Sequence, residues 1–449
     1  MIGATRLLSA LSTLVKRTRA DDVSVCAHAK TRRVFRFAQE AIHQDLIQES
    51  LAITVKVIAN HRVGVASTDT LEPTSLTRCA RAALEIARHT PPHRDLPALP
   101  SRHRLRTTTD YIPATVKLSS KECVRKLKRL FQLCKGAGVT LAGSLVTGED
   151  EFVVANSAEV ACYAASTVSG AKLVTMHQQL SGYASSVHRD IGQLDLDGLL
   201  KRSLQQSLHR RNPIAVPLGD YEVILEPEAV GELVTWLGYI AFGAKSVEER
   251  TSFLAGRLGE QVMDRQITVY DDGMDTSTLR LPFDFEGTPK QRVVLIDAGR
   301  AAGIVYDTAY GARFDHPSTG HGMPPDEVEG PFPLHLAIAP GRASVPEMIR
   351  SCKRGLWIPR FHYVNGLLNP REALMTGLTR EGAFLIEHGK LTSPITTLRF
   401  TQSLLEAFKR VLGISKERRV VADPSQELGC VVMPTIHLAK FRFTGRSER

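Results

Sequence analysis

Short segments in which apolar and polar residues alternate, many of them rich in β-branched side chains, limit the folds open to this chain. Residues 22–27, 34–38 and 51–58 have this pattern near the N-terminus, and residues 221–225 and 435–443 have it in the last 230 or so residues. Alternation with a period of two predicts strands with one buried face. The sequence therefore predicts β-structure in both halves of the chain.

Helical periodicity over residues 75–88, 117–135, 228–242 and 401–411 separates these strand segments. We therefore predict an α+β fold, in which N-terminal α/β domains precede a strand-rich C-terminal domain with a mostly antiparallel sheet. A chain of 449 residues is expected to form two or three domains. We place an N-terminal α/β domain at 1–90, a Pro-rich linker at 91–113, a central α/β domain at 114–213 and the strand-rich C-terminal domain at 214–449.

The composition is that of a globular protein, with 43% hydrophobic and 23% charged residues. The sequence contains no stretch of 18 uninterrupted apolar residues, so it predicts no membrane-spanning helix. The seven cysteines form no CxxC pair, which favours reduced thiols and a cytoplasmic location. Residues 1–22 combine helical apolar spacing with arginine and lysine, as a transit peptide also does. We interpret them as a first helix that packs on its own domain.

Basic residues are concentrated in the first third of the chain. Residues 1–135 contain 24 Lys and Arg against 11 Asp and Glu. Such a surface could attract an acidic partner, a peptide or a nucleic acid, or it could simply be solvated. It lacks interleaved aromatic residues and any reader motif, so the sequence does not favour a nucleic-acid partner. Phosphate-binding glycine motifs are also missing, which leaves nucleotide binding without support.

Three blocks of sequence resemble the TldD/PmbA family, formerly called modulators of DNA gyrase. Residues 53–88 are similar to its first domain, and residues 282–320 contain its Glu-Gly-x-Pro turn and Ser-Thr-Gly ending. Residues 360–408 carry its Asn-x-x-x-x-Pro, Thr-Gly, Thr-Arg-x-Gly and Leu-Arg-Phe-Thr spacing. The blocks occur in the family's order and extend over most of the chain.

The resemblance implies one of two kinds of subunit. In one kind, an HExxxH helix and a later cysteine hold a catalytic metal; the other kind lacks the motif and assembles with the first. The corresponding segment here is identified as residues 227–232, where Pro227 and Glu232 stand in the place of the two histidines and only Glu228 is retained. The chain thus resembles the subunit without the motif, often called TldE or PmbA.

Zinc chemistry at neutral pH needs about three protein ligands and one open position. Pro227 has no ligating side chain, and Glu232 without imidazole partners would bind a metal weakly. Cys430, a late cysteine, is the only conceivable remnant of the thiolate ligand, but it lies only four residues before Pro434, and we do not place it at the family's ligand position. We therefore expect no catalytic residue, no metal and no cofactor in this chain, with zinc held by the partner subunit.

A loop from Asp315 to His321 places Ser, Asp and two His residues close together in sequence. A nucleophile and base could be imagined there, but the loop has no G-x-S-x-G elbow. We interpret it as a polar loop, with contact to a peptide or partner through Ser318, Thr319, Gly320 and His321 as the second reading. Four further histidines are dispersed along the chain, and we interpret them as satisfied or exposed side chains: His335, His362, His388 and His437.

Two functions remain open from the sequence. The first, implied by the resemblance, is a noncatalytic subunit that forms a heterodimer with a metal-bearing TldD-type subunit. Together they would enclose an extended peptide or unfolded protein for proteolysis or for maturation of a precursor peptide. The second is a stand-alone peptide-binding or hydrolytic homodimer that uses the Asp315–His321 loop. A strand-rich domain suits either reading, because a sheet edge can pair with a peptide backbone whatever its sequence.

Overall fold

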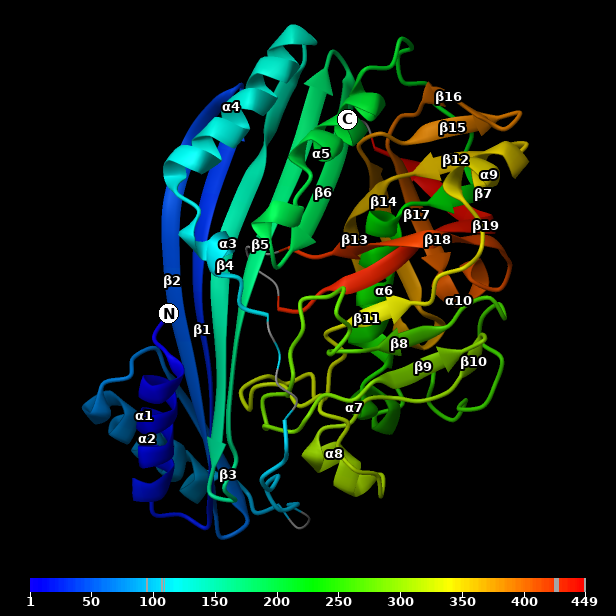
Figure 1. Ribbon diagram of the computed structural model, residues 1–449. Coiled ribbons are helices and arrows are strands. Elements are labelled where there is room, and N and C mark those ends of the chain that lie inside the picture. The colour runs from blue at the N-terminus through cyan, green and yellow to red at the C-terminus, as the bar shows by residue number, and fades with distance from the viewer. Residues whose placement is uncertain (94–95, 106–107, 109, 424–427, 448–449) are drawn as a thin grey trace.

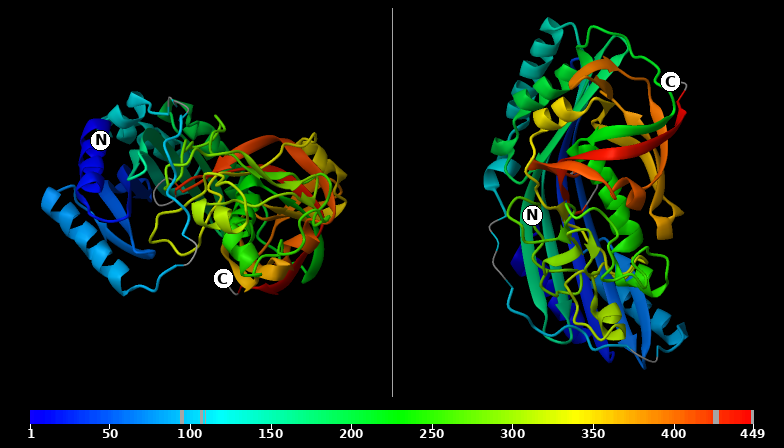
Figure 2. Two further views of the ribbon diagram at one scale, coloured as in Figure 1. Left: turned by 90° about the horizontal axis from the view of Figure 1, so that it is seen from below. Right: turned by 90° about the vertical axis from the view of Figure 1, so that its right-hand side faces the viewer.

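Two β-sheets lie side by side along the length of the protein in the computed structural model (Figures 1 and 2). It describes residues 1–449 except residues 94–95, 106–107, 109, 424–427 and 448–449. Helices pack on both sheets, so the predicted α+β class is confirmed. No helix in this described part of the chain is long and apolar enough to cross a membrane.

The first sheet is antiparallel throughout and contains six strands in the order β3-β2-β1-β4-β5-β6. Figure 1 shows α1, α2 and α4 on the side of this sheet that faces away from the second sheet. The elements of this half are α1 Ala4–Arg17, β1 Asp22–Ala38, β2 Ala41–Ala59, β3 Arg62–Thr68, α2 Pro73–His89, α3 Pro113–Lys117, α4 Ser120–Gly136, β4 Thr140–Asn156, β5 Ala161–His177, β6 Leu180–His188 and α5 Leu196–Ser207.

The strands of the first sheet are longer than the sequence predicted. We expected separate strands at residues 22–27 and 34–38, but β1 is continuous across the polar residues between them. These charges can remain within strands because they pair across the sheet. Arg32 on β1 donates to both oxygens of Asp150 on β4 at 2.9 and 2.8 Å, and His28 lies 2.8 Å from the same carboxylate. Burial opposes ionisation of Asp150, but His28 and Arg32 outweigh it and lower its pKa.

Strands from both sides of the Pro-rich segment belong to this one sheet. β1 pairs with β2 on one side and with β4 on the other, so residues 22–68 and 140–188 share a hydrogen-bonded ladder. The described residues of 91–112 contain no helix or strand. The division into domains at 90, 113 and 213 stays a prediction, but the segment at 91–113 does not interrupt the sheet.

The second sheet has 13 strands and contains two parallel pairs, β7 with β12 and β11 with β19. All its other pairs are antiparallel, as predicted. Its elements are β7 Gly219–Leu225, α6 Pro227–Ala241, α7 Ala244–Glu248, β8 Val269–Asp271, β9 Val293–Asp297, β10 Arg300–Ala301, α8 Thr308–Arg313, β11 Leu336–Ile338, α9 Val345–Ser351, β12 Arg354–Ile358, β13 Arg360–Asn369, β14 Leu374–Arg380, β15 Phe384–Glu387, β16 Lys390–Pro394, β17 Leu398–Ser403, α10 Leu404–Ala407, β18 Val411–Val421 and β19 Val431–Arg446.

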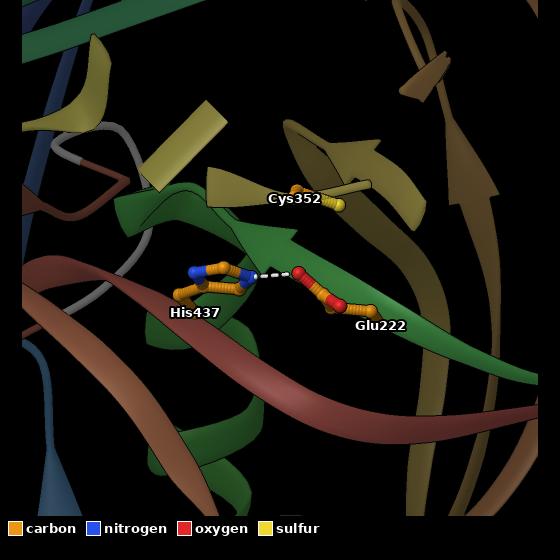
Figure 3. Close-up of side chains that lie close together, drawn as sticks. All are labelled: Glu222, Cys352 and His437. Atoms are coloured by element: carbon orange, nitrogen blue, oxygen red, sulfur yellow. Dashed lines mark hydrogen bonds and ion pairs between the residues drawn. The ribbon is translucent and has the colours of Figure 1, made fainter. Parts of the chain in front are cut away.

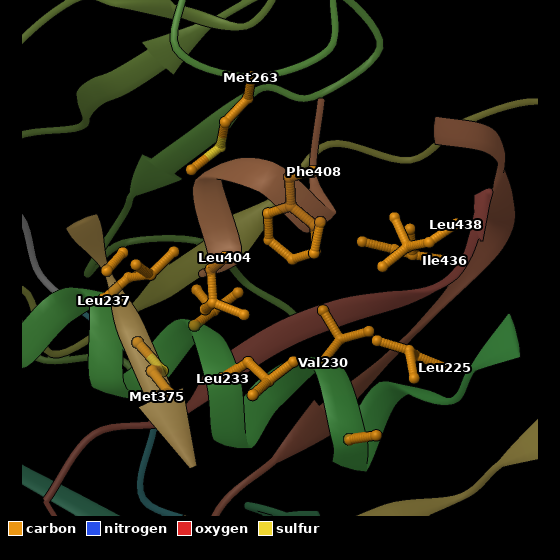
Figure 4. Close-up of a cluster of buried hydrophobic side chains, with 14 of the residues drawn as sticks. Leu225, Val230, Leu233, Leu237, Met263, Met375, Leu404, Phe408, Ile436 and Leu438 are labelled. Carbon is orange, nitrogen blue, oxygen red and sulfur yellow. The ribbon is translucent and has the colours of Figure 1, made fainter. Parts of the chain in front are cut away.

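Helix α6 is the centre of the largest hydrophobic core (Figure 4). Val230, Leu233 and Leu237 recur at helical spacing and are fully buried against side chains of the surrounding strands, among them Met375 and Ile436. Burial of each such side chain stabilises the fold by about 1.5–3 kcal/mol. The core therefore holds α6, and the segment that begins it, in a fixed place.

One predicted helix is wrong. Residues 401–411 carry apolar residues at helical spacing, but only Leu404–Ala407 are helical. Thr401 and Gln402 belong to β17, where they pair with Thr376 and Met375 of β14. Ladder pairing and burial of Leu404 and Phe408 prevail over the local periodicity.

Candidate functional site

The segment singled out by the sequence forms the start of α6. Pro227 is the first residue of the helix, where the missing N–H is no cost and its fixed φ suits the helix. Gly231 lets the helix approach the sheet, since a Cβ there would lie 3.3 Å from Val421 Cγ1 on β18. Pro227 is buried, Glu228 is mostly buried and Glu232 is exposed.

The carboxylates at this helix start are held by an arginine from a distant strand. Arg419 on β18 lies 3.0 Å from Glu228 Oε2 and 3.4 Å from Glu226 Oε2. Burial disfavours the charged guanidinium, but Glu228 and Glu226 outweigh it and raise the pKa of Arg419. Burial, with the neighbouring Glu228 carboxylate, also raises the pKa of Glu226, although Arg419 opposes this.

A second arginine approaches the same carboxylates from the other half of the molecule. Arg202 on α5 donates to the Ser185 carbonyl on β6 at 3.1 Å. Burial lowers the pKa of Arg202, and the nearby charge of Arg419 lowers it further, while Glu228 and Glu226 act in the opposite direction. At the start of α6, Arg419 therefore pairs with two carboxylates, and the charge of Arg202 lies near enough to interact with all three groups.

These side chains do not fit the metal of an HExxxH helix. α6 contains neither histidine nor cysteine, and zinc in proteins prefers imidazole and thiolate ligands. A permanently charged guanidinium already neutralises the carboxylates and would repel a cation. Cys430 does not complete a ligand set there, since its Sγ accepts a hydrogen bond from the Leu279 N–H at 3.3 Å and burial raises its pKa to about 12.

A groove of about 250 Å³ opens beside Glu228 and Glu232. One wall comes from the first sheet, with Lys172 on β5 and Tyr183 on β6, and the other comes from α6, β13 and β18. Contacts bridge the two walls: Lys172 pairs with Asp423 at 2.5 Å, and the Arg360 guanidinium lies 4.1 Å from the centre of the Tyr183 ring. The groove therefore lies where the two halves of the chain meet.

The Asp315–His321 loop does not assemble a nucleophile and base from the predicted residues. His321 has 1% of its surface exposed, and its two ring nitrogens contact Thr319 Oγ1 at 2.9 Å and Asp271 Oδ1 at 2.8 Å. Ser318 instead donates to the Tyr306 carbonyl at 3.3 Å. Thr319 Oγ1 accepts the Tyr306 N–H at 2.8 Å and lies 3.0 Å from the Tyr306 carbonyl, so this hydroxyl is engaged within the fold.

The second half of this loop therefore belongs to the protein interior. Thr319, Gly320 and His321 are buried, while Ser318 is half-buried and Asp315 is exposed. Burial disfavours the charged form of Asp271, but Lys290 and His321 outweigh it and hold its pKa well below the usual range. Contact with a peptide or partner through this loop stays a prediction, and of its four predicted contact residues only Ser318 has surface to offer.

Sequence reasoning missed the partners that define these sites. Arg419 lies 191 residues beyond Glu228, and Asp271 lies 50 residues before His321. No local spacing could have paired them.

Among the residues the structure describes, one group places three metal-ligating side chains together, Glu222, Cys352 and His437, and it lies outside the groove.

Comparisons with known proteins agree with this architecture. A model of the PmbA/TldA metallopeptidase C-terminal domain matches residues 218–445. The chain is 28% identical over 230 residues to the metalloprotease TldD homolog of Haemophilus influenzae, covering 50% of this chain and 45% of that protein. It is 23% identical over 407 residues to metalloprotease PmbA of Escherichia coli O157:H7, covering 86% and 85%. For the first curated relatives, the Haemophilus protein among them, the match spans less than two thirds of their length.

Two crystal structures are similar over nearly the whole chain. TldE from Thermococcus kodakarensis has a TM-score of 0.87 with 21% identity and covers 97% of this chain and 100% of that one. A modulator of DNA gyrase from Thermotoga maritima has a TM-score of 0.86 with 17% identity and covers 98% and 100%. At such identities these two likenesses establish the fold.

Proposed function

We propose that this chain, which belongs to the PmbA/TldD metallopeptidase family, is the noncatalytic, TldE-like subunit of a heterodimeric metallopeptidase. Its family resemblance, first drawn from three sequence blocks, is confirmed by the match over residues 218–445. The proposed partner is a TldD-type subunit with an intact HExxxH motif and zinc. The proposed substrate is an extended peptide or an unfolded protein, and we propose that the complex works in the cytoplasm.

The Arg419 guanidinium carries this proposal. It pairs with Glu226 and Glu228 at the start of α6, the segment that we propose as the counterpart of the metal motif. A zinc ion would need several protein ligands in its place and would compete with a fixed positive charge. The proposed role of the chain is therefore to complete the chamber rather than to supply the reactive metal.

The groove beside α6 is the proposed wall of the peptide path. The backbone groups of Tyr183, on the β6 side of the groove, already have hydrogen-bond partners. The Tyr183 N–H donates to Gln206 Oε1 at 2.9 Å, and Gln206 Nε2 donates to the Tyr183 carbonyl at 3.1 Å. We therefore expect peptide contact there through side chains, among them Tyr183, Arg360 and the exposed Thr235.

Co-purification with a metal-bearing family member tests the proposal. The two chains should elute as one complex, and metal analysis of the separated chains should find the catalytic zinc in the partner. The chain alone should cleave no peptide even with added zinc, and the complex should show cleavage that a chelator abolishes. Chelator-sensitive cleavage by this chain alone, or a crystal with zinc fully ligated by protein beside Glu228, would refute the noncatalytic role.

A variant in the groove tests the peptide path separately. Thr235→Trp places a large ring in the groove and should raise KM of the complex while leaving its assembly intact. Thr444→Trp, at an exposed position on β19, is the matched control and should leave KM unchanged. Equal KM values for both variants would exclude the groove from the peptide path.

A further inference from the structure

Three side chains from distant parts of the sequence meet beside the centre of the second sheet (Figure 3). They are Glu222 on β7, Cys352 directly after α9, and His437 on β19. One potential ligand atom of each lies within 4.8 Å of the other two. His437 Nε2 and Glu222 Oε1 are 2.7 Å apart.

Sheet register brings these residues together. His437 pairs with Ile224 of β7, so Glu222 occupies the diagonal position on the same face. Gly355 of β12 pairs with Glu222 on the other side. A Cβ at Gly355 would lie 2.6 Å from Cys352 Sγ, so the glycine leaves the space that the sulfur occupies.

The surroundings of the group are largely apolar. Cys352 and His437 are almost completely buried, while the Glu222 side chain keeps 26% of its surface exposed. Cys352 belongs to a hydrophobic cluster with Ile224, Met348, Trp357, Phe384 and Ile386. A dry shell around polar ligands strengthens their interaction with a cation, and the exposed part of Glu222 marks the side open to water.

We propose that Glu222, Cys352 and His437 form a zinc-binding site with one position open to water. One thiolate, one imidazole and one carboxylate are ligands typical of zinc, and three protein ligands with a water is a recurring coordination. The ion would join β7, β19 and the segment between α9 and β12. This site differs from the start of α6, and it departs from the sequence-based expectation that the chain holds no metal and that His437 is not a ligand.

Metal titration of the full-length chain, stripped by a chelator and dialysed, tests the proposal. The chain should bind one equivalent of zinc with a rise in Tm, because a ligand that binds only the native state stabilises it. Cobalt(II) should give a thiolate-to-metal charge-transfer band. X-ray absorption of the zinc form should find one sulfur at about 2.3 Å and nitrogen or oxygen ligands at about 2.0–2.2 Å. No bound metal, or a zinc shell without sulfur, would overturn the site.

Variants locate the bound ion. Cys352→Ser should remove the charge-transfer band of the cobalt form, because this band comes from the thiolate. His437→Gln should remove the rise in Tm that zinc produces. Glu222→Gln, at the partly exposed side of the group, should fold and bind zinc at least about tenfold more weakly. Cys134→Ser replaces another fully buried cysteine and is the matched control, with binding unchanged. Retention of the band in Cys352→Ser, wild-type affinity in Glu222→Gln, or loss of the band in Cys134→Ser would each contradict the proposal. The result is independent of peptidase activity and so of the proposed subunit role.

Discussion

Three glutamates within seven residues of the chain experience two different surroundings. Glu222 on β7 faces an imidazole and a thiol, whereas Glu226 and Glu228, at the turn into α6, face a guanidinium. An arginine keeps its charge at any pH at which the protein is folded. Histidine and cysteine can instead release protons and bind a metal. The counter-group, more than the carboxylate, decides which of the two places can accept a cation.

The two places also differ in what holds them. The start of α6 is anchored by the largest core of the protein and lies on the groove between the two sheets. The Glu222 group lies beside a smaller cluster formed by side chains of β7, α9, β12 and β15. Loss of the counter-group should therefore cost more stability at α6 than at Glu222.

Removal of the guanidinium should have the largest effect. Arg419→Met removes the guanidinium that pairs directly with Glu226 and Glu228 in a mostly buried place and leaves only the nearby charge of Arg202. Breaking such a pair from one side costs about 3–5 kcal/mol. We expect about 3 kcal/mol at neutral pH, because the Arg419 side chain is 25% exposed. Urea unfolding with circular dichroism measures this loss.

The stability loss of Arg419→Met, measured again at lower pH, checks whether the charge of Arg419 is responsible for it. The loss should shrink at lower pH, because burial raises the pKa of Glu226 and its protonated carboxyl no longer needs a cation. Lys416→Met, at an exposed position of the same strand, is the control and should change stability by less than about 0.5 kcal/mol. A loss that is equal at both pH values would show that Arg419 contributes packing rather than charge.

Replacement of the imidazole should have a smaller effect. His437→Gln in the metal-free chain removes the ring that contacts Glu222, but the carboxylate is 26% exposed and can be solvated instead. We expect a loss of about 1–2 kcal/mol, the range for an imperfectly replaced hydrogen bond. Thermal unfolding of the chelator-treated protein measures it.

An exposed histidine supplies the comparison for this second variant. His103→Gln lies at the surface and should leave Tm unchanged. If His437→Gln cost as much as Arg419→Met, the proposed contrast between the two places would be lost.

Local signals in the sequence predicted the scaffold of the site well. The strand at 221–225 and the helix that follows it agree with β7 and α6, because alternation, a proline at the helix start and an apolar stripe all point the same way. The charged middles of the long strands misled the same reasoning. Residues such as Arg32 and Asp150 resemble loop residues until they are seen as a diagonal ion pair on adjacent strands.

The groups that give the site its chemistry could not be predicted. Arg419, Glu222, Cys352 and His437 acquire their neighbours from the register of β7, β18 and β19, which no local spacing encodes. His437 was interpreted as one dispersed histidine for this reason. The absence of an HExxxH string could be read directly from the sequence, but the pairing of Arg419 with Glu228 required the fold.

The smallest expected effect concerns the protonation of Glu226. Burial raises its pKa in the folded state, so its protonated form favours the fold. That contribution is fully present below the pKa of an unfolded glutamate and is lost as pH rises through the folded value. Glu226→Gln removes this titration, so its stability relative to wild type should increase from acidic to neutral pH, by less than about 1 kcal/mol. Urea midpoints across that pH range measure it, with Glu417→Gln, at an exposed position on β18, as the control that should show no such trend. If the stability of Glu226→Gln relative to wild type instead fell as pH rises, Arg419 would hold Glu226 charged. The contact between Glu226 and Arg419 would then be an ordinary ion pair.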